Sequence, residues 1–203
     1  MRLNTSDIVA LPKRYRTNLI NSLSGFKSVN LVGSISADGI TNLSVVSSVI
    51  HLGANPALMG FIMRPISVTR DTYDNIKATH SYTFNHLTTD FYREAHQASA
   101  RYLPEESEFD AVGLTPQFGD RIKAPYVAES KVQIGLEWRD QKEIELNGTI
   151  LMIGEVVEIR LPDEIVATDG WLDLEAANTL TCCGLDSYHR TQQLERLPYA
   201  KRP

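Results

Sequence analysis

Hydrophobic and polar residues alternate over several short segments of the chain, which is the pattern of β-strands with one buried face. Residues 29–36 alternate in this way, a turn signal follows at Ala37-Asp38-Gly39, and residues 43–50 form a second β-rich segment. Two such segments joined by a short turn predict a β-hairpin. Further strands are predicted over residues 57–63, 81–85, 126–141 and 149–161.

Helical periodicity is confined to a few short segments. Between Pro12 and Gly25 the apolar residues Tyr15, Leu19 and Leu23 recur every fourth position, which predicts one amphipathic helix. Shorter helices are predicted over residues 71–78, from residue 88 or 89 to about residue 100, and near residues 173–177. Residues 101–125 contain three prolines and two glycines and are predicted to form a long surface excursion. The last forty residues are otherwise rich in turn signals.

The order of these elements predicts the fold class. Six or seven strands are joined mostly by hairpins, and they do not alternate regularly with helices, so a parallel sheet is disfavoured. We therefore expect a mainly β protein: a closed or partly closed antiparallel β-barrel with inserted short helices. At 203 residues the chain is long enough for one domain with a substantial core.

The charge of the chain narrows the classes of partner. The net charge of −5 argues against a nucleic-acid binder driven by phosphate contacts. Residues 1–80 nevertheless carry +4 and the remainder −9, and a basic region in an acidic protein favours a small anion. No apolar run approaches the ~20 residues that span a bilayer. The N-terminus lacks the apolar stretch of a secretory signal, so we expect a cytoplasmic protein without membrane segments.

Several common catalytic and binding motifs are absent from the sequence. It contains no G-x-S-x-G, no G-x-x-x-x-G-K-[ST], no G-x-G-x-x-G and no H-E-x-x-H. The five histidines are scattered without metal-ligand spacing, so we expect no metal site. The two cysteines, Cys182 and Cys183, are adjacent and lack the C-x-x-C spacing of redox motifs. We interpret them as two small, partly buried residues without a catalytic role.

Two polar segments are candidates for ligand binding. Residues 64–75 place Arg64, Ser67, Arg70 and Thr72 in a loop that leads into a helix, and a phosphate monoester favours guanidinium, hydroxyl and helix N-terminal N–H donors. A solvated surface loop would have a similar composition. Residues 42–48 carry small hydroxyl side chains within a β pattern, which lets a flat ligand approach the backbone, although a strand edge facing water fits equally well.

Taken in order, a larger set of motifs resembles the flavin reductase-like family. The matching segments are Asn30-Leu31-Val32-Gly33, Asp38-Gly39, residues 42–48, Asn55-Pro56, Arg70-Asp71-Thr72-x-x-Asn75, Phe84-Asn85, residues 109–116 and Ile153-Gly154-Glu155-Val156. The resemblance covers about residues 25–190 of a single domain that spans residues 1–203. It implies an FMN-binding split barrel of six strands in Greek-key order, assembled as a homodimer with FMN near the interface.

The resemblance also assigns residues and chemistry. It implies that Arg70, Thr72 and Ser67 hold the FMN phosphate, with Arg64 in the same loop. Ser47 and Ser48 would lie beside the isoalloxazine ring, and Asn85 matches an asparagine of the family. The candidate cofactor-binding residues are thus Ser47, Ser48, Arg64, Ser67, Arg70, Thr72 and Asn85, and His51, His86 and His96 are possible neighbours of the ring.

The implied activity is that of an NAD(P)H-dependent flavin reductase, in which hydride passes from nicotinamide to flavin N5 and NADH or NADPH binds only transiently. In such a protein the cofactor performs the redox chemistry while the chain orients it. Two alternatives remain open at this stage. The chain could be an FMN-bearing electron carrier that does not oxidise NAD(P)H, or a cofactor-free barrel with an interaction role.

Overall fold

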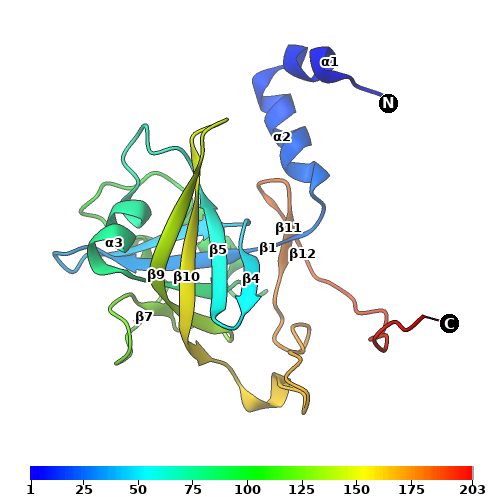
Figure 1. The fold of residues 1–203 in the computed structure, drawn as a ribbon. Coiled ribbons are helices and arrows are strands. Elements are labelled where there is room, and N and C mark those ends of the chain that lie inside the picture. Colours follow the sequence, from blue (N-terminus) through cyan, green and yellow to red (C-terminus); the bar gives the residue numbers. More distant parts are fainter. Residues whose placement is uncertain (203) are drawn as a thin grey trace.

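The computed structural model describes residues 1–202, and its main feature is a seven-stranded antiparallel sheet that curls into a split barrel (Figure 1). The strand order is β3-β2-β6-β9-β10-β5-β4. Its members are β2 (Asn30–Ile35), β3 (Thr41–Val46), β4 (Ile50–Ala54), β5 (Ala57–Met63), β6 (Ser81–His86), β9 (Gln133–Ile144) and β10 (Thr149–Arg160). The expected mainly β class is confirmed, and the sheet has one strand more than the six that the resemblance implied.

Strand β2 contributes side chains to two separate hydrophobic cores, one on each of its faces. Val32 points into the barrel, where its neighbours in the core are aromatic and aliphatic side chains of β5, β6, β9 and β10. Leu31 points outward and packs against Leu43, Phe91 and Phe109. Because side chains of a strand alternate between its faces, one strand can serve both cores. The predicted hairpin of β2 and β3 is confirmed by their antiparallel pairing.

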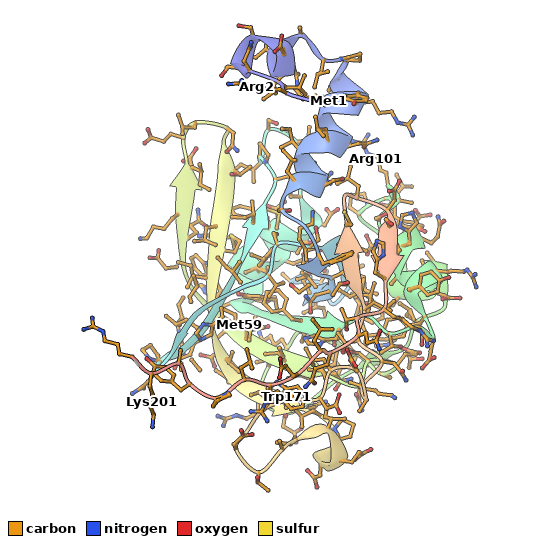
Figure 2. The ribbon with its side chains drawn as sticks, turned by 90° about the vertical axis from the view of Figure 1, so that its right-hand side faces the viewer. Met1, Arg2, Met59, Arg101, Trp171 and Lys201 are labelled. Atoms are coloured by element: carbon orange, nitrogen blue, oxygen red, sulfur yellow. The ribbon has the colours of Figure 1, made fainter. Side chains whose placement is uncertain are left out.

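Two helices, α2 (Lys13–Leu23) and α3 (Asp71–Thr79), lie close to the predicted positions, and α1 (Thr5–Ala10) is an additional helix that the sequence pattern did not predict. α3 packs against β2 and β3. α2 follows α1, and neither of these two helices contains a buried residue. Figure 1 shows both helices standing away from the barrel, and Figure 2 shows Met1 and Arg2 at the outer end of this arm. Across residues 1–202, none of the helices is long and apolar enough to cross a membrane.

Long-range pairing shortens two of the predicted elements. The segment 43–50 is not one strand, because β3 ends at Val46 and β4 begins at Ile50. The hydroxyl of Ser48 accepts a hydrogen bond from the Ile62 amide at 3.0 Å, so the chain here leaves β2 and crosses to β5. The helix predicted from residue 88 or 89 starts only at α4 (Tyr92–Gln97), because Thr88 is held in a β-bridge with Thr179.

Parts of the chain that were expected to be irregular contain additional elements. The excursion at residues 101–125 contains α5 (Glu108–Val112) and β7 (Pro116–Gln117), which pairs with β8 (Tyr126–Val127). Residues 174–178 form turns where the sequence predicted a helix near residues 173–177, and a short 3-10 helix, η1, occurs at Asp163–Ile165. The C-terminal region contributes two strands, β11 (Thr181–Cys183) and β12 (Ser187–His189), which form a second sheet with β1 (Lys27–Ser28) in the order β1-β11-β12.

Candidate functional site

The loop between β5 and α3 carries two arginines that form no salt bridge within residues 1–202. Arg64 is exposed directly after β5, and Ser67 is exposed in the same loop. Arg70 immediately precedes α3 and is half-buried, and its Nε donates to the Pro65 carbonyl oxygen at 3.3 Å. Two positive charges that form no ion pair within residues 1–202 favour an anion at this loop.

Thr72, in the first turn of α3, directs its side chain inward. It is 7% exposed, and its hydroxyl donates to Asn42 Oδ1 at 2.9 Å and lies 3.0 Å from Ser44 Oγ. The Thr72 hydroxyl therefore donates its proton to a side chain of β3 and not to a ligand at the surface. An anion beside Arg70 would instead meet the free backbone N–H groups in the first turn of α3.

Ser47 and Ser48 lie where β3 ends, beside the split of the barrel. β3 is an edge strand of the main sheet, so its second edge has no strand partner in the part of the chain that the structure describes. The Ser48 hydroxyl accepts from the Ile62 amide. Ser47 lies close to Cys182 of β11, and burial raises the pKa of that thiol. The Ser48 side chain therefore contacts a neighbouring strand, and the unpaired edge of β3 is left for the polar rim of a flat ligand.

Asn85 lies in the core rather than at a surface. It is fully buried, its Nδ2 donates to the Leu31 carbonyl oxygen at 3.2 Å and to Thr83 Oγ1 at 2.8 Å, and its Oδ1 accepts from the Val127 amide at 2.9 Å. These bonds fasten β6 to β2 and β8. Because both polar atoms of the side chain are occupied, we leave Asn85 out of the proposed site.

A buried carboxylate, which the sequence did not single out, supports the same region. Glu108 of α5 is 8% exposed and accepts hydrogen bonds from Asn42 Nδ2 at 3.0 and 2.9 Å and from the Leu43 amide at 2.9 Å. Burial raises the pKa of Glu108, and these hydrogen bonds oppose that rise. Glu108 falls in the segment that was expected to be a surface excursion, so no sequence signal marked it.

An acidic cavity of about 280 Å³ adjoins Glu108. Carboxylates line it without any lysine or arginine, and they belong to Asp38, Asp71, Glu105, Glu106 and Glu108. Their negative charge disfavours a phosphate group. An anion is therefore expected beside Arg64 and Arg70 and not in this cavity.

The three histidines named as possible neighbours of a flavin ring lie on three different elements. His51 is exposed on β4. His86 of β6 is half-buried, its Nδ1 lies 3.4 Å from Thr179 Oγ1, and burial lowers its pKa to about 4. His96 of α4 is exposed, with its Nδ1 2.8 Å from the Tyr188 hydroxyl. A role for any of them beside a ring stays a prediction.

Comparison with known proteins settles the family. The profile of the flavin reductase like domain matches residues 26–174. The chain belongs to the flavin reductase like family. Its elements from β2 to β10, including the loop with Arg64 and Arg70, lie inside the matched region.

Solved structures agree with this family assignment. This flavin reductase like chain is 48% identical to a protein from Shewanella frigidimarina NCIMB 400 classed as a flavin reductase with a split barrel domain, with 98% of this chain and 100% of that chain covered and a TM-score of 0.95. The flavoredoxin of Desulfovibrio vulgaris (Miyazaki F) is 21% identical over 87% of this chain and 92% of its own, with a TM-score of 0.75. An FMN-binding protein from Thermus thermophilus is 17% identical over 85% of this chain and 90% of its own, with a TM-score of 0.69. The last two likenesses show the shared fold alone.

Proposed function

We propose that this chain binds FMN and acts as an NAD(P)H-dependent flavin reductase, in which hydride passes from NADH or NADPH to flavin N5. The observation that carries the proposal is the placement of Arg64 and Arg70, both without salt-bridge partners among residues 1–202, in the loop that leads into α3 near the unpaired edge of β3. FMN has a dianionic phosphate at one end and a flat ring with a polar rim at the other. The loop matches the first requirement and the strand edge matches the second.

Each part of the site has a distinct task in this proposal. Arg70, Arg64 and Ser67, together with the backbone N–H groups at the start of α3, hold the phosphate. The edge of β3 around Ser47 and Ser48 supplies backbone donors and acceptors to the ring. FMN, when bound, supplies the electron-accepting chemistry, so the chain itself needs to bind and orient the reactants and requires no catalytic triad.

One experiment tests the proposal directly. The purified protein, reconstituted with FMN and freed of excess flavin, should absorb at about 450 nm, as oxidised flavin does. Anaerobic addition of NADH or NADPH should then bleach this band, and comparison of the two donors gives the nucleotide preference. Protein that does not retain or quench FMN would refute flavin binding and would favour the cofactor-free interaction role.

A second function is favoured by the absence of a dinucleotide fingerprint: the 203 residues contain no G-x-G-x-x-G segment. A flavin-bearing electron carrier would need no nucleotide site. In that case the absorbance band of oxidised flavin at about 450 nm is present. Dithionite bleaches this band, but NADH and NADPH do not. The same titration therefore separates the reductase from the carrier.

We also propose that the chain assembles as a homodimer. Apolar side chains are exposed on the arm and on the edge strand β4, among them Leu23 at 70%, Phe26 at 66%, Ile50 at 44% and Leu52 at 40%. A second copy would cover these residues and the open strand edge. Light scattering should give about 45 kDa, twice the 22.7 kDa of one chain. A monomer at micromolar concentration would contradict the proposal.

A further inference from the structure

A relay of hydrogen bonds connects α5 to β3 and to the start of α3, the two elements that form the proposed flavin site. Glu108 accepts from Asn42 Nδ2 at 2.9 and 3.0 Å, and Asn42 Oδ1 in turn accepts from the Thr72 hydroxyl at 2.9 Å. Asn42 Oδ1 also accepts from Ser34 Oγ at 2.9 Å. All four residues are buried, with Glu108 and Asn42 8% exposed. A single side chain of β3 thus lies between a carboxylate on one side and the start of α3 on the other.

The chemistry of the groups fixes the direction of this relay. An ionised carboxylate can only accept hydrogen bonds, so Asn42 must turn its NH₂ group toward Glu108. Its carbonyl oxygen then faces Thr72, and the Thr72 hydroxyl must be the donor. The Leu43 amide adds a further donor to the same carboxylate at 2.9 Å. Buried networks of this kind are strong only when each donor meets an acceptor.

The relay ends next to the residues that the proposed function uses. Thr72 is two residues after Arg70, and its hydrogen bond holds the first turn of α3 against β3. Leu43 and Asn42 belong to β3, whose far end leads to Ser47 and Ser48. Glu108 therefore fixes the position of the phosphate end of the site relative to its ring end, although it touches neither.

We propose that Glu108 is a positioning residue of the flavin site, which holds β3 and the start of α3 in register through Asn42 and Thr72. This inference rests on the proposed function for its ligand. It also assigns the Thr72 hydroxyl to the relay, which leaves Arg70, Ser67 and backbone N–H groups as the donors to the phosphate. The relay requires one donor that faces one acceptor between positions 42 and 108.

A swap of donor and acceptor tests the relay. Glu108→Gln places two amide NH₂ groups face to face, and Asn42→Asp places two carboxylates face to face. Each single variant should raise the FMN dissociation constant about tenfold, the range for loss of one hydrogen bond to a charged group. The double variant Asn42→Asp/Glu108→Gln keeps the net charge, restores one donor facing one acceptor, and still offers Thr72 a carboxylate oxygen. Its dissociation constant should return to within about threefold of the wild-type value.

The matched control is Asp110→Asn, which removes one charge from an exposed position of the same helix. It should leave FMN binding unchanged. Urea unfolding of the flavin-free variants measures the relay independently of the ligand, and the double variant should again recover the stability lost in the singles. A double variant that is no better than the worse single variant in both measurements overturns the relay.

The two measurements also separate the inference from the proposed function. Recovery in urea together with unaltered FMN affinity in every variant would show a relay that serves only the fold, which overturns the positioning role. Failure of the wild-type protein to bind FMN would refute the proposed function and the positioning role with it, while the urea data still decide whether the relay exists.

Discussion

Replacing Arg70 by alanine should weaken the binding of FMN and leave the binding of riboflavin nearly unchanged. Riboflavin lacks the phosphate that Arg70 is proposed to hold, so the difference between the two flavins isolates this one contact. The Arg70 guanidinium is half-buried, and the one hydrogen bond that it makes within residues 1–202 is from Nε to Pro65. Its terminal nitrogens therefore keep their donor capacity for a phosphate.

The expected loss follows from this environment. A charge-assisted hydrogen bond to an ionised group contributes about 1.5–3 kcal/mol, whereas a fully exposed ion pair contributes about 0–1 kcal/mol. Half-burial and the absence of a salt bridge to Arg70 among the described residues place it in the first range. The FMN dissociation constant should rise by about 10- to 150-fold.

Fluorescence titration of each variant with FMN and with riboflavin measures this effect. Arg70→Lys keeps the charge but loses the planar fork, so it should show an intermediate loss. Arg101→Ala removes an exposed arginine outside the loop and should bind both flavins as the wild type does. Equal losses for FMN and riboflavin in Arg70→Ala would show that Arg70 supports the fold and does not contact the phosphate.

Three further predictions concern stability and the cysteines. Burial lowers the His86 pKa to about 4, below the unfolded value of about 6.5. The folded protein should therefore lose up to about 3 kcal/mol as the pH falls from about 6.5 to 4, and His86→Gln should remove this slope in urea titrations. Gly33→Ala should destabilise by about 1–3 kcal/mol in thermal unfolding, because its Cβ would overlap the Pro125 carbonyl oxygen; Gly53→Ala, with its closest contact at 3.4 Å, is the control. Serine at both positions of Cys182-Cys183 should keep FMN affinity and any NAD(P)H oxidation within about threefold, and a hundredfold drop with flavin bound would reveal a thiol role.

The local pattern of residues was sufficient to predict most strands of the barrel. The hairpin of β2 and β3, the strand β5 and the helix α3 are specified by residues that are close in sequence: alternation, a turn at Gly39, a proline after the strand and an acidic first turn. The loop with Arg64 and Arg70 was found for the same reason, because its guanidinium and hydroxyl groups lie within a few residues of one another. The resemblance of the sequence to the flavin reductase-like family then suggested FMN as the ligand, which composition alone could not identify.

Long-range contacts decided the features that the sequence did not indicate. β11 and β12 are strands because they pair with each other and because β11 also pairs with β1, which lies more than 150 residues away from it. Helix α4 is shortened by the bridge from Thr88 to Thr179, and Asn85 is withdrawn from the surface by bonds to β2 and β8.

The sequence by itself determined the class of fold, the order of most strands and the basic loop, because each depends on neighbours within a few positions. Only the tertiary structure decided which polar side chains of that set turn into the fold and which stay at the surface. Thr72 turns inward because Asn42 and, behind it, Glu108 offer its hydroxyl a buried acceptor chain. A carboxylate 66 residues from its partner in sequence thus sets the orientation of the site, since hydrogen-bond partners in a folded core are selected by proximity in space and not along the chain.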